Sequence, residues 1–313
     1  VILGGNPVYD APADLDFASA LAKVPHAIAL SHTVDETASR TEWHVPLAHY
    51  LESWGDARAV GGTLSVVQPL ILPLFGGRSA IEVLGLMAGG KDRPGHDIVR
   101  DTWKPILGEA GFDTAWNRVL HDGLLAGREL PEVVPEARPE AFAALQGLRQ
   151  GSGQGLRQGS GQGLRQGSGQ GLRQGSGGLE IVFLPSASVH DGRFANDGWL
   201  QELPDPLTKL TWDNPALVSP TTAATLGVAD GDVVRVDYAG RSLELPVWQL
   251  PGMANGVVAL TLGYGRTRAG RIGSGVGFDT FAVRVSTAPG FDGGAAVSPR
   301  GGRHPLSATQ NHG

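Results

Sequence analysis

The chain has 313 residues, of which 41% are hydrophobic, so it is long enough for a sizeable core and about two domains. Its net charge of −6 provides no basic surface, and we therefore expect no nucleic-acid partner. The absence of cysteine excludes disulfides, thiolate metal sites and cysteine-ligated iron–sulfur clusters from these residues. No long apolar span stands out, so we also expect no direct membrane span. Because the sequence opens with VILGG and without an initiator methionine, we expect a piece of a longer protein.

The first part of the chain alternates short apolar strands with helices. Residues 1–5 and 27–31 predict two buried strands, and residues 13–24 between them have helical spacing with Asp14 as the N-cap. This order is a βαβ pattern, which is typical of a parallel sheet. Ligand groups in such sheets gather where the strands end, so the loops after the two strands are the first places to look for a site.

Three further helices are predicted in this part. The clearest begins at Ser79, because the sequence S-A-I-E places Glu82 at the third position of a capping box. The pair Gly89-Gly90 is expected to end it. Residues 96–107 and 113–125 supply the other two helical segments.

The octet QGLRQGSG occurs four times without change between residues 146 and 177. One leucine in eight residues cannot build a core, and Gly/Ser/Gln segments bury too little apolar surface to offset their backbone entropy. We predict a disordered, dispensable linker. A repeat architecture is the weaker alternative, since solenoid units need about 20 residues or more and an apolar face each. A third interpretation is a basic arm for an acidic partner, carried by the arginine in each octet.

After the octets the pattern changes from helices to strands. Residues 221–228 predict one short helix ended by Gly227, and residues 233–238 predict an alternating strand. The dipeptide Ala239-Gly240 then predicts a turn into residues 241–248, and a further strand follows at residues 256–262. We predict a β-rich domain with a barrel-like meander.

The stretch ALSHTVDETASRTEWHVPLAHY, residues 29–50, contains candidate ligands and proton carriers. His32, Glu36, His44 and His49 raise the possibility of a zinc site, but no short chelate such as H-E-x-x-H appears, so a hydrogen-bonded cluster is favoured. A carboxylate pair of Asp35 and Glu36 would need both groups to face one substrate atom, whereas neighbours in an extended loop point apart. A cap and loop-fixing role for Glu36-Thr37 is the favoured interpretation.

The best candidate for an anion site lies among the glycines of residues 263–277. Arg266, Arg268 and Arg271 could grip a phosphate bidentately while the glycines let backbone N–H groups approach it. The alternative is a glycine-rich loop whose arginines pair with Asp279 and other acids.

These motifs resemble those of a known family. LGVADGDVVRV (226–236) and LPGMANGVVALTLGYG (250–265) are similar to the C-terminal dinucleotide-binding barrel of the molybdopterin oxidoreductase, or dimethyl sulfoxide reductase, family. Gly5-Asn6-Pro7, Glu36-Thr37-Ala38 and the E-x-x-G element at 52–55 resemble the preceding domain, although the element A-D-x-x-L-P has become TEWHVP at 41–46. Within the family, the closest resemblance is to the large iron–sulfur subunit of alternative complex III, a quinol-oxidising membrane complex. It rests on the segments NPVYDAPADLDFA, TEWHVPLAHYLESWGDARA, QPLILPLFGGRSA, LTWDNPALVSP and GYGRTRAGRIGSGVGFDTF.

The resemblance implies an α/β plus β fold, with a Rossmann-like domain at 1–145 and a double-psi-type β-barrel at 179–313, separated by the predicted linker at 146–178. It implies a region that lacks the molybdopterin cofactor and is not itself catalytic, while the iron–sulfur clusters lie in a cysteine-rich part that this chain does not contain. The vestigial cofactor-binding candidates are Asn6, Glu36, Thr37, Tyr264, Arg266 and Arg268, with no metal ligands. The alternative is the cofactor-binding half of an active molybdopterin guanine dinucleotide oxidoreductase.

The resemblance also implies a place in an assembly. We expect other subunits of a membrane quinol-oxidising complex as partners, and a peripheral location on the periplasmic face of the membrane. Trp43, Trp54 and Tyr264 lie in loops together with several arginines, and such side chains are the usual anchors of buried interfaces. We therefore expect the loops at 43–54 and 264–271 to be buried against other domains.

Overall fold

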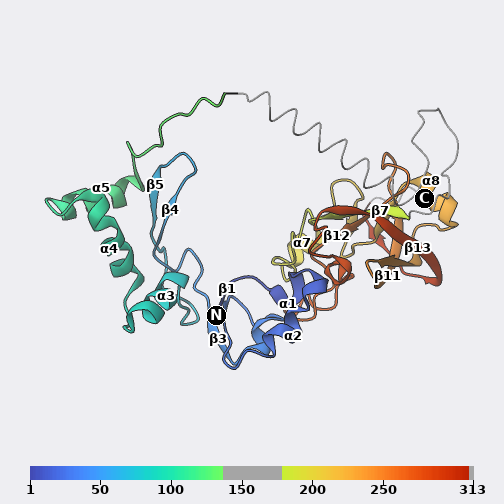
Figure 1. Ribbon diagram of the computed structural model, residues 1–313, viewed down its shortest axis with the longest axis horizontal. Coiled ribbons are helices and arrows are strands. Elements are labelled where there is room, and N and C mark those ends of the chain that lie inside the picture. Colours follow the sequence, from blue (N-terminus) through green and yellow to red (C-terminus); the bar gives the residue numbers. More distant parts are fainter. Residues whose placement is uncertain (137–177, 310–313) are drawn as a thin grey trace.

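The computed structural model describes residues 1–136 and 178–309, so residues 146–177 of the predicted linker lie outside the described residues. The described residues form a mixed α/β structure with a closed six-stranded barrel and three small sheets. Along the chain they make a parallel sheet, then a helical part, then the barrel (Figure 1). In these residues no helix is both long enough and apolar enough to cross a membrane.

The N-terminal sheet confirms the predicted βαβ unit. Strands β1 (Ile2–Leu3), β2 (Ile28–Ser31) and β3 (Trp43–Pro46) are all parallel and lie in that order. Between the first two strands the chain forms α1 (Pro7–Asp10), a 3₁₀ turn at Ala13–Leu15 and α2 (Phe17–Leu21).

The prediction of a single helix over residues 13–24 is wrong about where the helix begins. Asp16 adopts a left-handed conformation with φ of 43° and splits the segment, and its side chain caps α2 by accepting from the Ser19 N–H. Asp14 is therefore not the N-cap. Its carboxylate instead accepts hydrogen bonds from the N–H and Oγ of Ser286, at 2.8 and 2.6 Å, and so joins this turn to the barrel domain.

The helical part confirms the three predicted helices: α3 (Ala80–Gly89), α4 (Gly95–Leu107) and α5 (Phe112–Asp122). The last of them ends earlier than predicted, because Gly123 caps it and residues 124–125 form a strand. At α3 the capping box is complete, because the Ser79 Oγ accepts from the Glu82 N–H and the Glu82 carboxylate accepts from the Ser79 N–H. The helices lie beside an antiparallel sheet that the sequence did not predict, made of β4 (Gly55–Arg58), β5 (Leu64–Val67) and β6 (Leu124–Leu125). This part has its own core around Trp103 and Trp116.

The barrel closes in the strand order β10-β11-β9-β12-β7-β13. Its strands are β7 (Leu179–Leu184), β9 (Ala216–Val218), β10 (Asp232–Tyr238), β11 (Arg241–Gln249), β12 (Val257–Thr261) and β13 (Phe291–Arg303). Helix α8 (Pro220–Leu226) ends at Gly227, and β10 turns into β11 at Ala239-Gly240, both as predicted. The predicted meander stops there, because β9 lies between β11 and β12. A short helix α7 (Gly198–Glu202), the pair β8 (Leu210–Thr211) and β14 (Ser307–Ala308), and a 3₁₀ turn at Thr280–Val283 complete the domain.

The main core fills the barrel and extends to helix α1 of the N-terminal part. It is built from inward-facing residues of all six strands, among them Ile181, Val218, Val234, Leu245 and Leu260. Tyr9 of α1 belongs to the same cluster and packs edge-on against Phe281 at 5.0 Å between ring centroids. Helix α1 therefore joins the barrel core through Tyr9, which positions the site between the N-terminal sheet loops and the barrel.

Candidate functional site

The structure brings the strand-end residues of the N-terminal sheet against the glycine-rich loop of the barrel. Asn6 follows β1 and Glu36 follows β2, so both lie at the carboxyl edge of neighbouring parallel strands, as the sequence predicts. The Asn6 side chain donates to Glu36 Oε2 at 2.7 Å. Its own Oδ1 accepts from the N–H and Oγ1 of Thr37, at 3.0 and 2.7 Å. Three of the predicted candidates thus form one hydrogen-bonded group.

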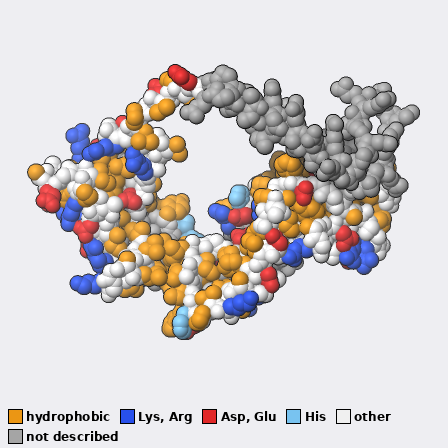
Figure 2. Space-filling view, viewed as in Figure 1, with side chains coloured by type: hydrophobic (Ala, Val, Ile, Leu, Met, Phe, Trp, Pro, Cys, Tyr) orange, Lys and Arg blue, Asp and Glu red, His pale blue; other side chains and the backbone are white. Residues whose placement is uncertain are grey.

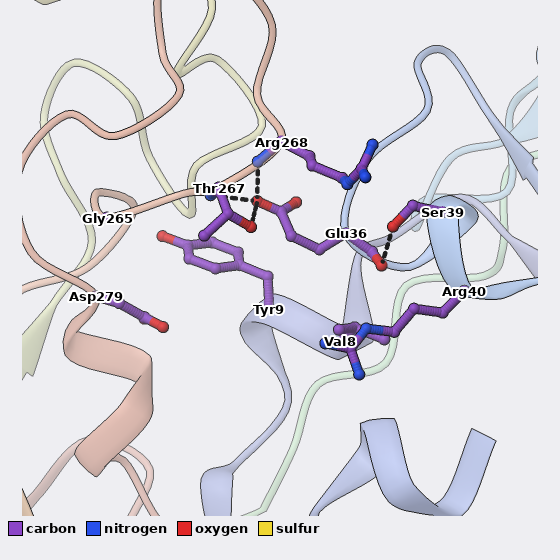
Figure 3. A pocket seen from close by; sticks show the side chains of 9 residues that line it. All are labelled: Val8, Tyr9, Glu36, Ser39, Arg40, Gly265, Thr267, Arg268 and Asp279. Carbon is purple, nitrogen blue, oxygen red and sulfur yellow. Dashed lines mark hydrogen bonds between the residues drawn. The ribbon is translucent and has the colours of Figure 1, made fainter. Parts of the chain in front are cut away.

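Glu36 crosses from this group to the barrel loop. Arg266 donates from both Nη2 and Nε, at 2.6 Å to Oε2 and 3.4 Å to Oε1, and the side chains of both residues are only 8% exposed. Oε1 also accepts from the backbone N–H groups of Thr267 and Arg268, each at 2.8 Å (Figure 3). We call Glu36, Arg266, Asn6 and these two N–H groups the Glu36 clasp. It joins residues about 230 positions apart into one buried ion pair.

The Glu36 clasp keeps the carboxylate ionised. Burial by itself raises the pKa of Glu36, but the hydrogen bonds from Arg266, the Arg268 N–H and Asn6 outweigh burial and lower the pKa to about 2. Arg266 is fixed further by donating to the Gly192 and Arg268 carbonyls at 2.9 and 3.0 Å. Its guanidinium lies over the Tyr9 ring, 5.4 Å from the centroid.

Glycine is required where the loop meets its neighbours. Gly192 has a φ of 96°, and a Cβ there would lie 2.9 Å from the Tyr9 ring and 3.0 Å from Arg266 Cδ. Gly265 has a φ of 73°, and a Cβ there would lie 2.1 Å from the backbone nitrogen of Asp279. Gly192 and Gly265 therefore allow neighbouring segments of the chain to pack closely against each other at this loop.

The sequence did not single out Tyr9, and it named Asp279 only as a pairing acid for the loop arginines. Tyr9 is buried, and its hydroxyl donates to the Tyr264 carbonyl at 2.7 Å, while burial and nearby acids raise its pKa. Asp279 caps the turn at Thr280–Val283, and burial raises its pKa to about 6. Tyr9 follows Asn6 by three residues, so its position just after the first strand could have indicated that it belongs to the site.

A polar cavity of about 180 Å³ lies beside the clasp. Figure 3 shows its lining, which comes from the N-terminal sheet loops (Val8, Tyr9, Glu36, Ser39, Arg40) and from the barrel (Gly265, Thr267, Arg268, Asp279). Ligand pockets for cofactors usually enclose roughly 300–1,000 Å³. Of the donors that the sequence suggested for a phosphate, the Arg266 guanidinium already binds Glu36, as do the backbone N–H groups of Thr267 and Arg268. As arranged, these donors do not fit the phosphates of a pterin dinucleotide.

The remaining predicted residues have other roles. The capping role assigned to Glu36-Thr37 belongs to Asp35, whose Oδ1 accepts from the N–H groups of Thr37 and Ala38 at 3.0 and 2.8 Å. The acid that binds Arg266 is Glu36 and not Asp279. Arg268 and Arg271 have exposed side chains.

The histidines of residues 29–50 bind protein groups. His44 Nε2 lies 3.1 Å from both the Ser31 carbonyl and its Oγ, and His32 Nδ1 lies 3.2 Å from the Leu47 carbonyl. His49 Nδ1 accepts from the Leu51 N–H at 3.3 Å. In residues 1–136 and 178–309, no three His, Cys, Asp or Glu side chains are grouped so as to hold a metal ion.

The two loops that we expected to be docking surfaces differ in how far their residues are buried. In the 264–271 loop, Tyr264, Arg266 and Ala269 are buried, and the loop packs on the N-terminal sheet within this chain. The expected 43–54 loop begins in strand β3, where Trp43 is 63% exposed, whereas Trp54 packs partly on the helical core.

Comparison with known proteins gives the fold. No protein-family model matches the chain, and no curated protein sequence matches it. Among solved structures, it is similar to acetylene hydratase from Pelobacter acetylenicus, with a TM-score of 0.53 and 15% identity. The match covers 90% of this chain and 39% of that one, so the chain spans about two fifths of its neighbour's length. At this identity the likeness concerns the fold alone.

Proposed function

We propose that this chain is a non-catalytic, structural part of a larger electron-transfer oxidoreductase. In this proposal a molybdopterin-type fold, with a Rossmann-like half and a double-psi-type barrel, is retained as a scaffold without its cofactor. The parent is the large iron–sulfur subunit of alternative complex III, which docks on other subunits at the periplasmic face of the membrane. Its iron–sulfur clusters lie in a cysteine-rich part outside this chain.

The observation that carries the proposal is the Glu36 clasp. In an open α/β sheet, a ligand binds in the crevice at the carboxyl ends of the strands. Here the Arg266 guanidinium and two loop N–H groups, which are the natural phosphate donors, bind a carboxylate of the protein itself. The strand-end residue Glu36 therefore binds the barrel loop and not a ligand. This is a structural role. The sequence segments that resemble alternative complex III supply the finer assignment.

The experiment is elemental and pterin analysis of the full-length parent protein. We expect several iron atoms per chain. We expect no stoichiometric molybdenum, tungsten or oxidised pterin. Stoichiometric molybdenum with a pterin would reject the scaffold role and support the active molybdopterin enzyme instead. One observation favours that second candidate, because Arg40 and Arg268 line the cavity and are solvent-exposed.

A second experiment uses the 313-residue chain itself. We expect no heat of binding when guanosine diphosphate, a mimic of the dinucleotide's phosphates, is titrated into it. Saturable binding that Arg268→Ala abolishes and Arg271→Ala leaves intact would show that the loop still serves as a phosphate site, and would contradict the proposal.

A further inference from the structure

Residues 70–89, LILPLFGGRSAIEVLGLMAG, are apolar and ordered but are hardly buried. Twelve of these twenty residues are hydrophobic and two are charged. In the structure only Ser79 of this segment is buried. We call residues 70–89 the apolar segment. Soluble proteins rarely expose a contiguous apolar patch of this kind unless it is an interaction site.

The first half of the apolar segment is a loop held rigidly at its base. The Leu51 carbonyl accepts from the N–H groups of Leu70 and Ile71, and the Leu74 N–H donates to the Glu52 carboxylate at 3.2 Å. Where the loop ends, the Arg78 N–H donates to the Pro46 carbonyl at 2.9 Å and extends the parallel sheet past β3. The backbone is thus fixed while the side chains of Leu70, Leu72, Leu74 and Phe75 face solvent. A preorganised loop loses little conformational entropy when it binds.

The second half is helix α3, which has no buried residue of its own. One side meets α4, where Gly85 lies close to the Ile98 side chain. Leu84, Leu86 and Met87 remain exposed. Figure 2 shows hydrophobic side chains gathered over the part of the molecule where α3 and the N-terminal sheet lie. An apolar helix of this composition is stable on a surface only when another element covers it.

The charges around the apolar segment favour a protein over a lipid bilayer. Arg78 pairs with Asp92 at 3.0 Å, and Arg93 and Lys104 both pair with Asp101. Three basic side chains near the segment are therefore paired with acids, which leaves Lys91 as a single exposed cation next to its end, and the whole chain carries a net charge of −6. Adsorption to an anionic membrane usually needs a cluster of four or more unpaired basic residues, at about 1 kcal/mol each.

We propose that the apolar segment is a docking surface for a neutral, apolar face of a further domain of the parent polypeptide. The inference rests on the proposed function, in which this chain is part of a larger subunit. The fold likeness supports it independently, since the matched region makes up 39% of the neighbour's chain. The segment meets the parallel sheet just after β3, where Arg78 pairs with Leu47, so the docked domain lies beside the carboxyl end of that strand.

The test compares this chain with the full-length parent, each carrying Leu72→Lys and Phe75→Lys together. These side chains are 86% and 84% exposed, so the melting temperature of the isolated chain stays within about one degree of the unmodified chain. In the parent, the same change lowers the melting temperature by several degrees and speeds hydrogen exchange of residues 70–87 about tenfold or more. The matched control is Leu207→Lys in the barrel domain, a 76% exposed leucine, which changes neither protein.

Equal hydrogen exchange of residues 70–87 in the isolated chain and in the parent would overturn the proposal. So would sedimentation of the chain with phosphatidylcholine–phosphatidylserine vesicles that is lost in the double variant, because the occupant would then be a bilayer. A concentration-dependent dimer in ultracentrifugation that the double variant abolishes would assign the surface to a second copy. All of these readouts are independent of metal content, so the scaffold role and the docking surface can fail separately.

Discussion

At the scale of single residues, the Glu36 clasp is expected to contribute strongly to stability because its ion pair is buried. A buried ion pair repays its desolvation only when its hydrogen bonds are complete, and removing one partner leaves an unpaired buried charge. We predict that Glu36→Ala and Arg266→Ala each lower the free energy of unfolding by about 3–5 kcal/mol, as measured by chemical denaturation. The double variant is expected to lose less than the sum of the two.

The control for the clasp is Glu244→Ala. Glu244 and Arg300 form an ion pair of similar length, 2.8 Å, but both side chains are about half exposed. Such surface pairs contribute about 0–1 kcal/mol because water and salt screen them. A loss at Glu36 no larger than the loss at Glu244 would mean that the clasp does not hold the two parts together.

The clasp also predicts the response of stability to acid. The pKa of Glu36 is lowered from 4.5 to about 2 in the folded chain, so its stabilisation is complete above about pH 4.5 and is lost as the pH falls towards 2. Glu36→Gln is expected to reduce this acid-dependent decline in melting temperature. An unchanged profile between pH 2 and 5 would contradict the ionised clasp.

Asp279 predicts the opposite pH dependence of stability, which falls as the pH rises. Burial raises its pKa from 3.8 to about 6, so the contribution of this group is most favourable below about pH 4 and is lost as the pH rises through 6. Asparagine keeps the capping acceptor for the Phe281 N–H but does not ionise. We predict that Asp279→Asn stabilises the chain at pH 7.5 by on the order of 1–3 kcal/mol, and that the gain vanishes near pH 4. A gain that is the same at both pH values would reject the assignment.

At the scale of elements, Gly265 of the barrel loop at 263–277 occupies a position that has no room for a side chain. A Cβ on Gly265 would overlap the backbone of Asp279, whereas a Cβ on Gly252 would meet nothing within 4 Å, although both residues have positive φ. Gly252→Ala is expected to cost about 1–2 kcal/mol of unfolding free energy from backbone strain alone. Gly265→Ala is expected to cost clearly more and to speed exchange of the Thr267 and Arg268 amides. Equal effects of the two substitutions would indicate that the loop yields without breaking the clasp.

At the scale of the whole molecule, residues 1–136 and 178–309 contain two separate cores. Tyr9 and the barrel share one core, and Trp103 and Trp116 centre the other within the helical part. Trp103 is 1% exposed and donates to Asp56 at 3.0 Å. We predict that Trp103→Ala costs about 3–5 kcal/mol and removes hydrogen-exchange protection from residues 54–125, while the barrel stays protected. Val236→Ala in the barrel should do the reverse, and loss of protection in both parts from either variant would show one cooperative unit.

The sequence by itself determined the features that depend on neighbouring residues. The capping box of α3, the glycine end of α8 and the turn at Ala239-Gly240 are local arrangements of backbone donors and acceptors, so their residues predict them. The βαβ order of the first strands follows in the same way from hydrophobic pattern. Local signals failed at Asp14 and Asp16, because the carboxylate of Asp14 found a partner 272 residues away.

Only the tertiary structure decided how these elements meet. Strand β12 pairs with β9 and β7 and not with β11, since closing the barrel removes exposed strand edges that a simple meander would leave. The sequence pointed to Asn6, Glu36, Thr37 and to Tyr264, Arg266, Arg268 as two separate groups of cofactor candidates. Their union into an ion pair follows from the docking of the sheet on the barrel, where burial of Tyr9 brings the two loops together and a carboxylate and a guanidinium, once desolvated, must find each other.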